Sequence, residues 1–209
     1  MKNSLRWSEL ATIVAALSFA VGCGPELQEG SSNQVQSQRS ALTTTLYAIR
    51  PSSVVASVGM TGTPFSASAD LYKDVNDASP DFDASYINGV SGTQSTIDFA
   101  FPVPAHDGPV SAVNNIYFAR NSLCTAAGLC GTIHTEILQG STVVAVSASH
   151  QLPNIEQGWY MYSDSFSLSP GQVSSIAQLR SRVVLSHFLP YSTQPERVST
   201  FAAHITYSY

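Results

Sequence analysis

Positively charged residues are scarce in this chain. Lys and Arg together number 9 in 209 residues, against 14 Asp and Glu, and the formal net charge is −5. Proteins hold nucleic acid mainly by neutralising phosphates with cations, and they hold anionic membrane surfaces with polybasic patches. The composition therefore argues against nucleic acid as a partner and against electrostatic binding to a membrane surface.

The sequence motifs of several enzyme classes are also missing. Gly89-Val-Ser91-Gly92 falls one residue short of the Gly-x-Ser-x-Gly nucleophile turn, and neither His-Glu-x-x-His nor a Gly-rich phosphate loop occurs. The histidines are dispersed: His106, His134, His150, His187 and His204. We predict no catalytic residue and no cofactor from these patterns. A hydrolase whose His and Asp converge only in the fold stays open as an alternative.

The apolar run near the N-terminus is too short to cross a bilayer. Leu10–Val21 follows Lys2 and Arg6 and contains twelve residues, whereas a spanning helix needs about 20. A short positive region followed by such a run is typical of a secretory signal peptide. We predict that residues 1–22 are a signal peptide and are absent from the mature protein.

The end of this run reads Ala20-Val21-Gly22-Cys23. It resembles the lipobox of bacterial lipoproteins, in which the cysteine receives a diacylglycerol and becomes the new N-terminus. The resemblance implies lipidation of Cys23 and, because Gly24 rather than Asp follows, an outer-membrane location. The periplasmic or surface face of that membrane stays open. The alternative is an ordinary signal peptide with a cysteine near its cleavage site by chance.

The segment that follows the cysteine is rich in Gln, Ser and Gly and has few apolar residues. Such a composition cannot bury enough surface to offset the entropy of ordering. We predict that residues 23–43 are a lipidated cysteine and a flexible linker, with a reach of about 25 Å as a random coil. Residues 44–209 are then a single domain of ordinary size. Removing residues 1–22 leaves seven basic and thirteen acidic residues, a net charge of −6.

Cysteine is rare as well, with three residues in all. If Cys23 carries lipid, Cys124 and Cys130 remain, with five residues between them in a loop of small side chains. An oxidising compartment favours a disulfide between them. Two other readings stay open: free thiols, or zinc with His134 as a third ligand, although zinc usually takes closer cysteines and a fourth ligand.

The rest of the chain has the patterns of strands and turns. Arg197–Tyr209 and Leu179–Leu189 alternate apolar and polar residues, and Gly131–Leu138 and Thr142–Ser149 flank a short turn at Gly140. Further strands are predicted at Thr45–Arg50, Thr96–Phe101, Val110–Arg120 and Gly158–Leu168. We predict an all-β fold, an antiparallel β-sandwich of seven to nine strands with at most one short helical turn, after Ser169-Pro170-Gly171.

Three segments carry a loose resemblance to a known module. Asp81-Phe-Asp-Ala-Ser-Tyr86-Ile87, Gly158-Trp159 and Arg197–Tyr207 together resemble a jelly-roll module of uncharacterised bacterial secreted and phage-structural proteins. The resemblance spans roughly residues 45–209. It implies a sandwich fold, and it brings no established catalytic residues to transfer to this chain.

An acidic stretch is the first candidate binding site. Five oxygen-bearing side chains fall close together in the sequence: Asp74, Asn76, Asp77, Asp81 and Asp83. Calcium takes six to eight oxygen ligands, which sandwich loops can supply. The stretch therefore makes calcium a possible cofactor. The alternative is a solvated acidic loop in which Asp residues start turns around Pro80.

An aromatic stretch, Gly158–Tyr162, is the second candidate. On a strand, Trp159 and Met161 share one face and Tyr160 and Tyr162 share the other. An exposed aromatic pair could stack on a sugar ring, which makes Trp159, Tyr160 and Tyr162 candidate ligand-binding residues. The alternative places Trp159 and Met161 in the core with the tyrosines half-buried.

The sequence favours a non-catalytic, lipid-anchored envelope or surface module over an enzyme. Its predicted partners are a membrane, through the anchor, and an envelope protein or a glycan. A carbohydrate-binding module, with or without calcium, is the first alternative, and the hydrolase is the second.

Overall fold

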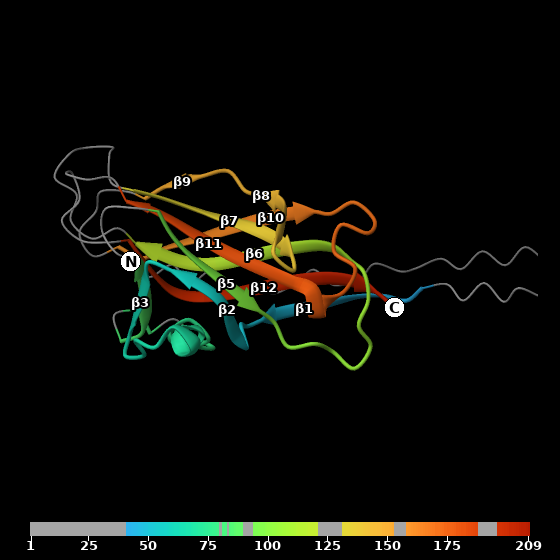
Figure 1. The fold of residues 1–209 in the computed structure, drawn as a ribbon, viewed down its shortest axis with the longest axis horizontal. Helices are drawn as coiled ribbons and strands as arrows, with labels where there is room; N and C mark the ends of the chain where they lie inside the picture. Colours follow the sequence, from blue (N-terminus) through green and yellow to red (C-terminus); the bar gives the residue numbers. More distant parts are fainter. Residues whose placement is uncertain are drawn as a thin grey trace, which may run out of the picture. The chain divides into compact units, whose positions relative to one another are not determined.

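The structure, a computed structural model, describes residues 41–79, 81–82, 84–89, 94–120, 131–152, 158–187 and 196–209. Residues 40–209 form one compact unit. Within the described residues, two six-stranded antiparallel sheets pack face to face (Figure 1). The predicted all-β antiparallel sandwich is therefore confirmed, but the prediction of seven to nine strands is wrong, because the described residues form twelve.

The first sheet, sheet A, has the order β10-β6-β12-β4-β3, and β1 also pairs with β12. Its strands are β1 (Thr43–Ile49), β3 (Met60–Thr63), β4 (Tyr86–Gly89), β6 (Val110–Arg120), β10 (Tyr160–Ser167) and β12 (Arg197–Ser208). β12 is the long central strand, with β4 beside its first residues and β1 beside its last ones.

The second sheet, sheet B, has the order β2-β5-β11-β7-β8, and β9 also pairs with β7. Its strands are β2 (Ser53–Val58), β5 (Gln94–Ala100), β7 (Gly131–Gln139), β8 (Thr142–Val146), β9 (His150–Gln151) and β11 (Leu179–His187). The predicted β7–β8 hairpin is confirmed, since Gln139 pairs with Thr142. Gly140 has a φ of +60° in its turn, a conformation that glycine adopts without steric cost.

Two short 3₁₀ helices accompany the sheets, which is one more than predicted. η2 (Ile176–Gln178) lies in the predicted turn region, and η1 (Ser68–Asp74) lies in the acidic stretch. η1 forms because Leu71 and Val75, both fully buried, anchor the stretch to the core. In the described part of the chain, no helix has the length and apolar character needed to cross a membrane.

The core lies between the sheets and follows the predicted alternation. Phe201, Ala203 and Ile205 of β12 are fully buried, as are Leu179 and Val183 of β11. A bulge between Val198 and Thr200 shifts the phase of β12, so that Val198 is buried as well. Burying each large apolar side chain contributes about 1.5–3 kcal/mol to folding.

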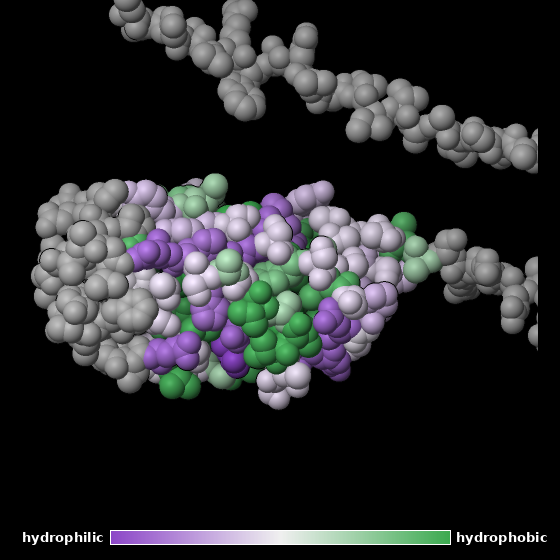
Figure 2. All heavy atoms as spheres, turned by 90° about the horizontal axis from the view of Figure 1, so that it is seen from above, coloured by the Kyte–Doolittle hydropathy of each residue, from purple (hydrophilic) through white to green (hydrophobic). Residues whose placement is uncertain are grey.

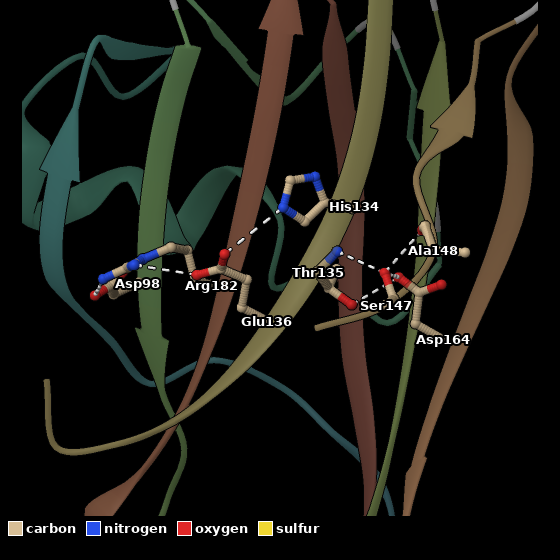
Figure 3. A network of polar contacts seen from close by, with 8 residues as sticks. All are labelled: Asp98, His134, Thr135, Glu136, Ser147, Ala148, Asp164 and Arg182. Atoms are coloured by element: carbon tan, nitrogen blue, oxygen red, sulfur yellow. Dashed lines mark hydrogen bonds and ion pairs between the residues drawn. The ribbon is translucent and has the colours of Figure 1, made fainter. Parts of the chain in front are cut away.

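A buried carboxylate links the two sheets along one edge. Asp164 on β10, 4% exposed, accepts hydrogen bonds at Oδ2 from Tyr117 Oη (3.0 Å), Thr135 Oγ1 (2.6 Å) and Ser147 Oγ (3.0 Å). Its Oδ1 lies 2.6 Å from His150 Nε2. Thr135, Ser147 and His150 belong to sheet B or its connections, so four donors from both sheets converge on one side chain. Figure 3 shows Thr135 and Ser147 beside Asp164. Burial, and then the Asp164 charge, raise the pKa of Tyr117.

Replacing this carboxylate should destabilise the whole sandwich. Asp164→Ala leaves the buried hydroxyls of Tyr117 and Thr135 without an acceptor, and each such group costs about 1–3 kcal/mol. We expect the free energy of unfolding in urea to fall by about 3 kcal/mol or more. Ser167→Ala, at an exposed position of the same strand, should change it by less than about 0.5 kcal/mol. Equal effects of the two variants would contradict the role of Asp164.

Candidate functional site

Aromatic and sulfur-containing side chains gather on the outer face of sheet A, where β6 ends and β10 begins. We call Phe82, Phe118, Trp159 and Met161 the aromatic surface. The ring centroid of Phe82 lies 5.8 Å from that of Trp159 and 5.7 Å from that of Phe118. Met161 is directly opposite Phe118 in the β10–β6 ladder, and the Arg120 guanidinium lies 5.0 Å from the Trp159 centroid.

This surface is open to solvent and is partly strained. Phe82 is 37% exposed and Met161 is 64% exposed. Phe82 also has a φ of +55°, which is uncommon for a bulky residue and costs on the order of 1–3 kcal/mol. The Nε1 atom of Trp159 is buried, and in the described part of the chain it has no hydrogen-bond partner. The fold thus holds an exposed ring in an unfavourable backbone conformation beside an unsatisfied donor.

The acidic stretch supplies the turn that presents Phe82. Asp81 Oδ1 accepts hydrogen bonds from the Ser85 backbone N–H (3.2 Å), and it lies 2.8 Å from Ser85 Oγ, as does Asp77 Oδ2. The two sequence candidates, the acidic stretch and Trp159, are therefore neighbours in space. Only the structure shows this, because Phe82 connects segments that are more than 70 residues apart.

The predicted calcium ligands do not form one cluster in the described residues. Asp77 and Asp81 meet at Ser85, whereas Asp74 Oδ1 accepts a hydrogen bond from the Phe65 N–H (3.1 Å). Asp83 lies outside the described residues, within which no three His, Cys, Asp or Glu side chains are placed to hold a metal ion. Calcium binding stays a prediction.

Asp74 is instead a buried carboxyl group with an unusual pKa. It is fully buried, its Oδ2 has no partner in the described chain, and that atom lies against Gly62, where any side chain would collide with it. The pKa of Asp74 is raised to about 6. Burial is the largest cause, the hydrogen bond from the Phe65 N–H lowers the pKa, and the negative charges of Asp77, Asp81 and Asp70 raise it.

The charge of Asp74 should make the fold less stable at neutral pH. Because the folded pKa exceeds the unfolded value, the folded state gains stability from the proton below pH 4 and loses it as the pH rises through 6. Asp74→Asn should raise the free energy of unfolding by about 2–3 kcal/mol at pH 7 and by little below pH 4. Urea unfolding across pH 3.5–8 measures this difference. Ser68→Ala, at an exposed position of η1, is the control, and the same pH profile in both variants would refute the assignment.

The three predicted sugar-binding residues do not share one surface. Trp159 and Met161 lie on the outer face of sheet A, whereas Tyr160 and Tyr162 are half-buried on the opposite side of β10. Tyr162 packs on Tyr117, with centroids 5.6 Å apart, and on His150. The reading that places Met161 in the core is wrong, because the residues of β10 that point inward are Tyr160, Tyr162, Asp164 and Phe166.

His150 and Asp164 are the one His–Asp hydrogen-bonded pair of the described residues. The His150 side chain is 30% exposed, so its second ring nitrogen could act as an acid or base. The neighbouring hydroxyl of Ser147, however, is hydrogen-bonded to the Asp164 carboxylate, and no serine hydroxyl of the described chain is hydrogen-bonded to His150. Among the described residues, the pair is therefore not joined to a serine in the way that a serine hydrolase requires.

A second polar group lies on the outer face of sheet B. Arg182 Nε and Nη2 donate to the two carboxylate oxygens of Asp98 (2.6 and 2.9 Å), and Nη1 donates to Glu136 (3.1 Å). The His134 ring lies 3.7 Å from Glu136 (Figure 3). The hydrogen bonds to Asp98, above all, raise the pKa of Arg182. Because its donors are occupied by these carboxylates, we assign this group a structural role.

The side of the domain that carries β8, β9 and β10 has a hydrophobic patch bordered by hydrophilic residues (Figure 2). Among the exposed large hydrophobic residues that the structure describes, Val143 and Val146 belong to β8 and Met161 belongs to β10. The two valines lie on sheet B, whereas Phe82, Phe118 and Trp159 bring their rings together on sheet A, so stacking on a sugar ring favours the aromatic surface.

The remaining sequence candidates lie outside the described residues. These are the lipidation site Cys23, most of the linker, and the predicted disulfide pair Cys124 and Cys130. All three cysteine assignments stay predictions. Phe82, Phe118 and Arg120 were not predicted as site residues. An aromatic residue inside the acidic stretch was a signal for Phe82. Phe118 and Arg120 carry no sequence signal beyond their place in a predicted strand.

Comparison with known proteins gives similarities to solved structures alone. No family model and no curated protein matches the chain. An arabinose-bound α-L-arabinofuranosidase has a TM-score of 0.42 and 15% identity over 62% of this chain, which spans 21% of that protein's length. A family 35 carbohydrate-binding module from Clostridium thermocellum has a TM-score of 0.40 and 11% identity, covering 79% of this chain and 99% of that one.

A second family 35 module, from Paenibacillus barcinonensis, has a TM-score of 0.38 and 11% identity, with 77% and 97% of the two chains covered. All three chains are very different in sequence from this one, and the TM-scores are below 0.5. What this chain binds therefore has to be argued from its own residues.

Proposed function

We propose that this domain is a non-catalytic module that binds carbohydrate through the aromatic surface on the outer face of sheet A. The observation that carries the proposal is Phe82, a bulky residue held at a positive φ, partly exposed, and packed against Trp159 and Phe118. Strain of this kind persists where the surrounding structure enforces it, often at ligand-binding sites. Flat apolar rings offer the faces of sugar rings a stacking surface.

The chemistry around the rings supports a sugar as the ligand. Sugars combine weakly polar C–H faces with hydroxyl groups that donate and accept hydrogen bonds. The rings of Phe82, Phe118 and Trp159 offer those C–H faces an apolar surface, and Phe82 is partly exposed on it. The neighbouring Asp77–Asp81–Ser85 group could bind calcium or a further hydroxyl, and comparing binding with and without EDTA separates these roles.

Phe82→Gly is the sharpest test, because it should remove binding while changing stability little. Glycine adopts a positive φ freely, so relief of the backbone strain offsets the lost contacts with Trp159 and Phe118, and the free energy of unfolding should change by less than about 1 kcal/mol. Glycan-array binding by the Cys23→Ser mature chain should fall at least tenfold in this variant and in Trp159→Ala. Val103→Ala, at an exposed site between β5 and β6, is the control.

Two results would oppose the proposal. One is the absence of binding to any glycan, with calcium or with EDTA, by the folded chain. The other is binding that Phe82→Gly and Trp159→Ala leave unchanged, which would place the ligand elsewhere on the domain.

We further propose that Cys23 anchors this module in the outer membrane through lipid, with the linker as a tether. Each acyl chain contributes about 0.8 kcal/mol per buried CH₂, and two or more hold a protein stably on a bilayer. In the native host, palmitate labelling and the membrane fraction should both be lost in Cys23→Ser. Labelling that persists in this variant would rule out Cys23 as the lipidated residue, and the variants of the aromatic surface should keep the label.

A further inference from the structure

We propose that the ligand is a chain of several uncharged sugar rings that lies across the outer face of sheet A, from the aromatic surface to a second aromatic position at Tyr47. This inference rests on the proposed function, because it extends the same surface. It also states which class of glycan fits: an extended, neutral polysaccharide rather than a single terminal sugar.

Tyr47 on β1 is the most exposed of the large hydrophobic residues that the structure describes, at 73%. Its ring stands edge-on to the imidazole of His204, with centroids 5.3 Å apart and an interplanar angle of 74°. The next residue, Ala48, has a φ of +49° at an irregularity in the β1–β12 pairing. As at Phe82, an exposed ring stands next to a left-handed backbone conformation.

The strand register places Tyr47 on the same face as the aromatic surface. His204 on β12 pairs with Asn114 on β6, and Asn114 pairs with Ser165 on β10. Phe118 is four residues beyond Asn114 on β6, which is about 13 Å along the strand. β1 lies two strands from β6, which is about 10 Å across the sheet. The two aromatic positions are therefore separated by roughly 16 Å, a span that several consecutive sugar rings can cover and one ring cannot.

The surface between them is suited to hydroxyl groups. Asn114 Oδ1 accepts hydrogen bonds from Ser163 Oγ (2.8 Å) and Ser165 Oγ (3.2 Å). With its oxygen used in this way, the Asn114 amide has two N–H donors with no hydrogen bond to the described residues, and both serine oxygens keep lone pairs for a further donor. This alternation of donors and acceptors matches a row of sugar hydroxyls.

The charge of this face favours a neutral ligand. The outward positions of β6, β10 and β12 between the two aromatic positions carry Asn, Ser, Thr, Ala, Ile and His, and none carries Asp, Glu, Lys or Arg. A protein interface of this size would have a wide apolar centre, whereas here Ile116 and Ala202 are bordered by Asn114 and the serines of β10. The arrangement of rings at two ends and hydroxyls between them fits a glycan better than a protein.

The test is the dependence of affinity on chain length. The Cys23→Ser mature chain is titrated by calorimetry with neutral β-1,4-linked xylo-, manno- and gluco-oligosaccharides of one to six rings. For the series that binds, we expect the hexasaccharide to bind at least tenfold more tightly than the disaccharide. Tyr47→Ala should lower the affinity for the hexasaccharide about tenfold and leave that for the disaccharide unchanged.

Tyr209→Ala removes another exposed tyrosine and is the matched control; the urea midpoint confirms that both variants are folded. Equal affinity for short and long chains, or a Tyr47→Ala effect that is the same for both, would overturn the inference. If either of these results is found but Trp159→Ala abolishes disaccharide binding, the inference fails and the proposed function stands. If no oligosaccharide binds and the glycan array is also negative, both fail.

Discussion

The hydrogen bonds to the Asp164 carboxylate are the constraint on which the two sheets depend. One carboxylate accepts hydrogen bonds from a tyrosine of its own sheet and from threonine, serine and histidine side chains of the other side. A buried charge costs much less free energy when its hydrogen-bond partners are complete, so these donors must keep their positions. The network thereby fixes β10 against β7 and β9, and β10 in turn places Trp159 and Met161 beside Phe118.

The aromatic surface and the acidic stretch both reduce stability for reasons that a binding role explains. Phe82 at a positive φ is locally unfavourable, and so is the buried Nε1 of Trp159, which has no hydrogen-bond partner among the residues that the structure describes. Asp74, with its pKa raised to about 6, is a charged group buried at neutral pH next to the same segment. Residues with an unfavourable backbone conformation or an unfavourably buried group occur most often at functional sites, where the rest of the fold compensates for their cost. The segment from η1 to Ser85 has two such exceptions, which strengthens the case that it presents a ligand-binding residue.

The alternation of side chains predicted the long strands well and the short ones poorly. β6 has the predicted bounds, Val110–Arg120, and β12 and β11 agree within a few residues, because a strand with one buried face needs a period of two. β2, β3, β4 and β9 were missed. Each is short or lies at an edge, where pairing with a neighbour, rather than a buried face, makes the strand. η1 was missed because the acidic residues around Leu71 and Val75 read as a loop.

The sequence by itself determined the class of fold, the alternating core positions of the long strands, and the two stretches from which a binding site was expected. Those properties are local, since they follow from side-chain period and composition. Only the tertiary structure decided that β11 and β12, neighbours in sequence, belong to different sheets, and that Asp164 faces inward. It also decided that Trp159 meets Phe82 while Tyr160 and Tyr162 point the other way. These are matters of strand register and sheet order, which depend on contacts between residues far apart in the chain.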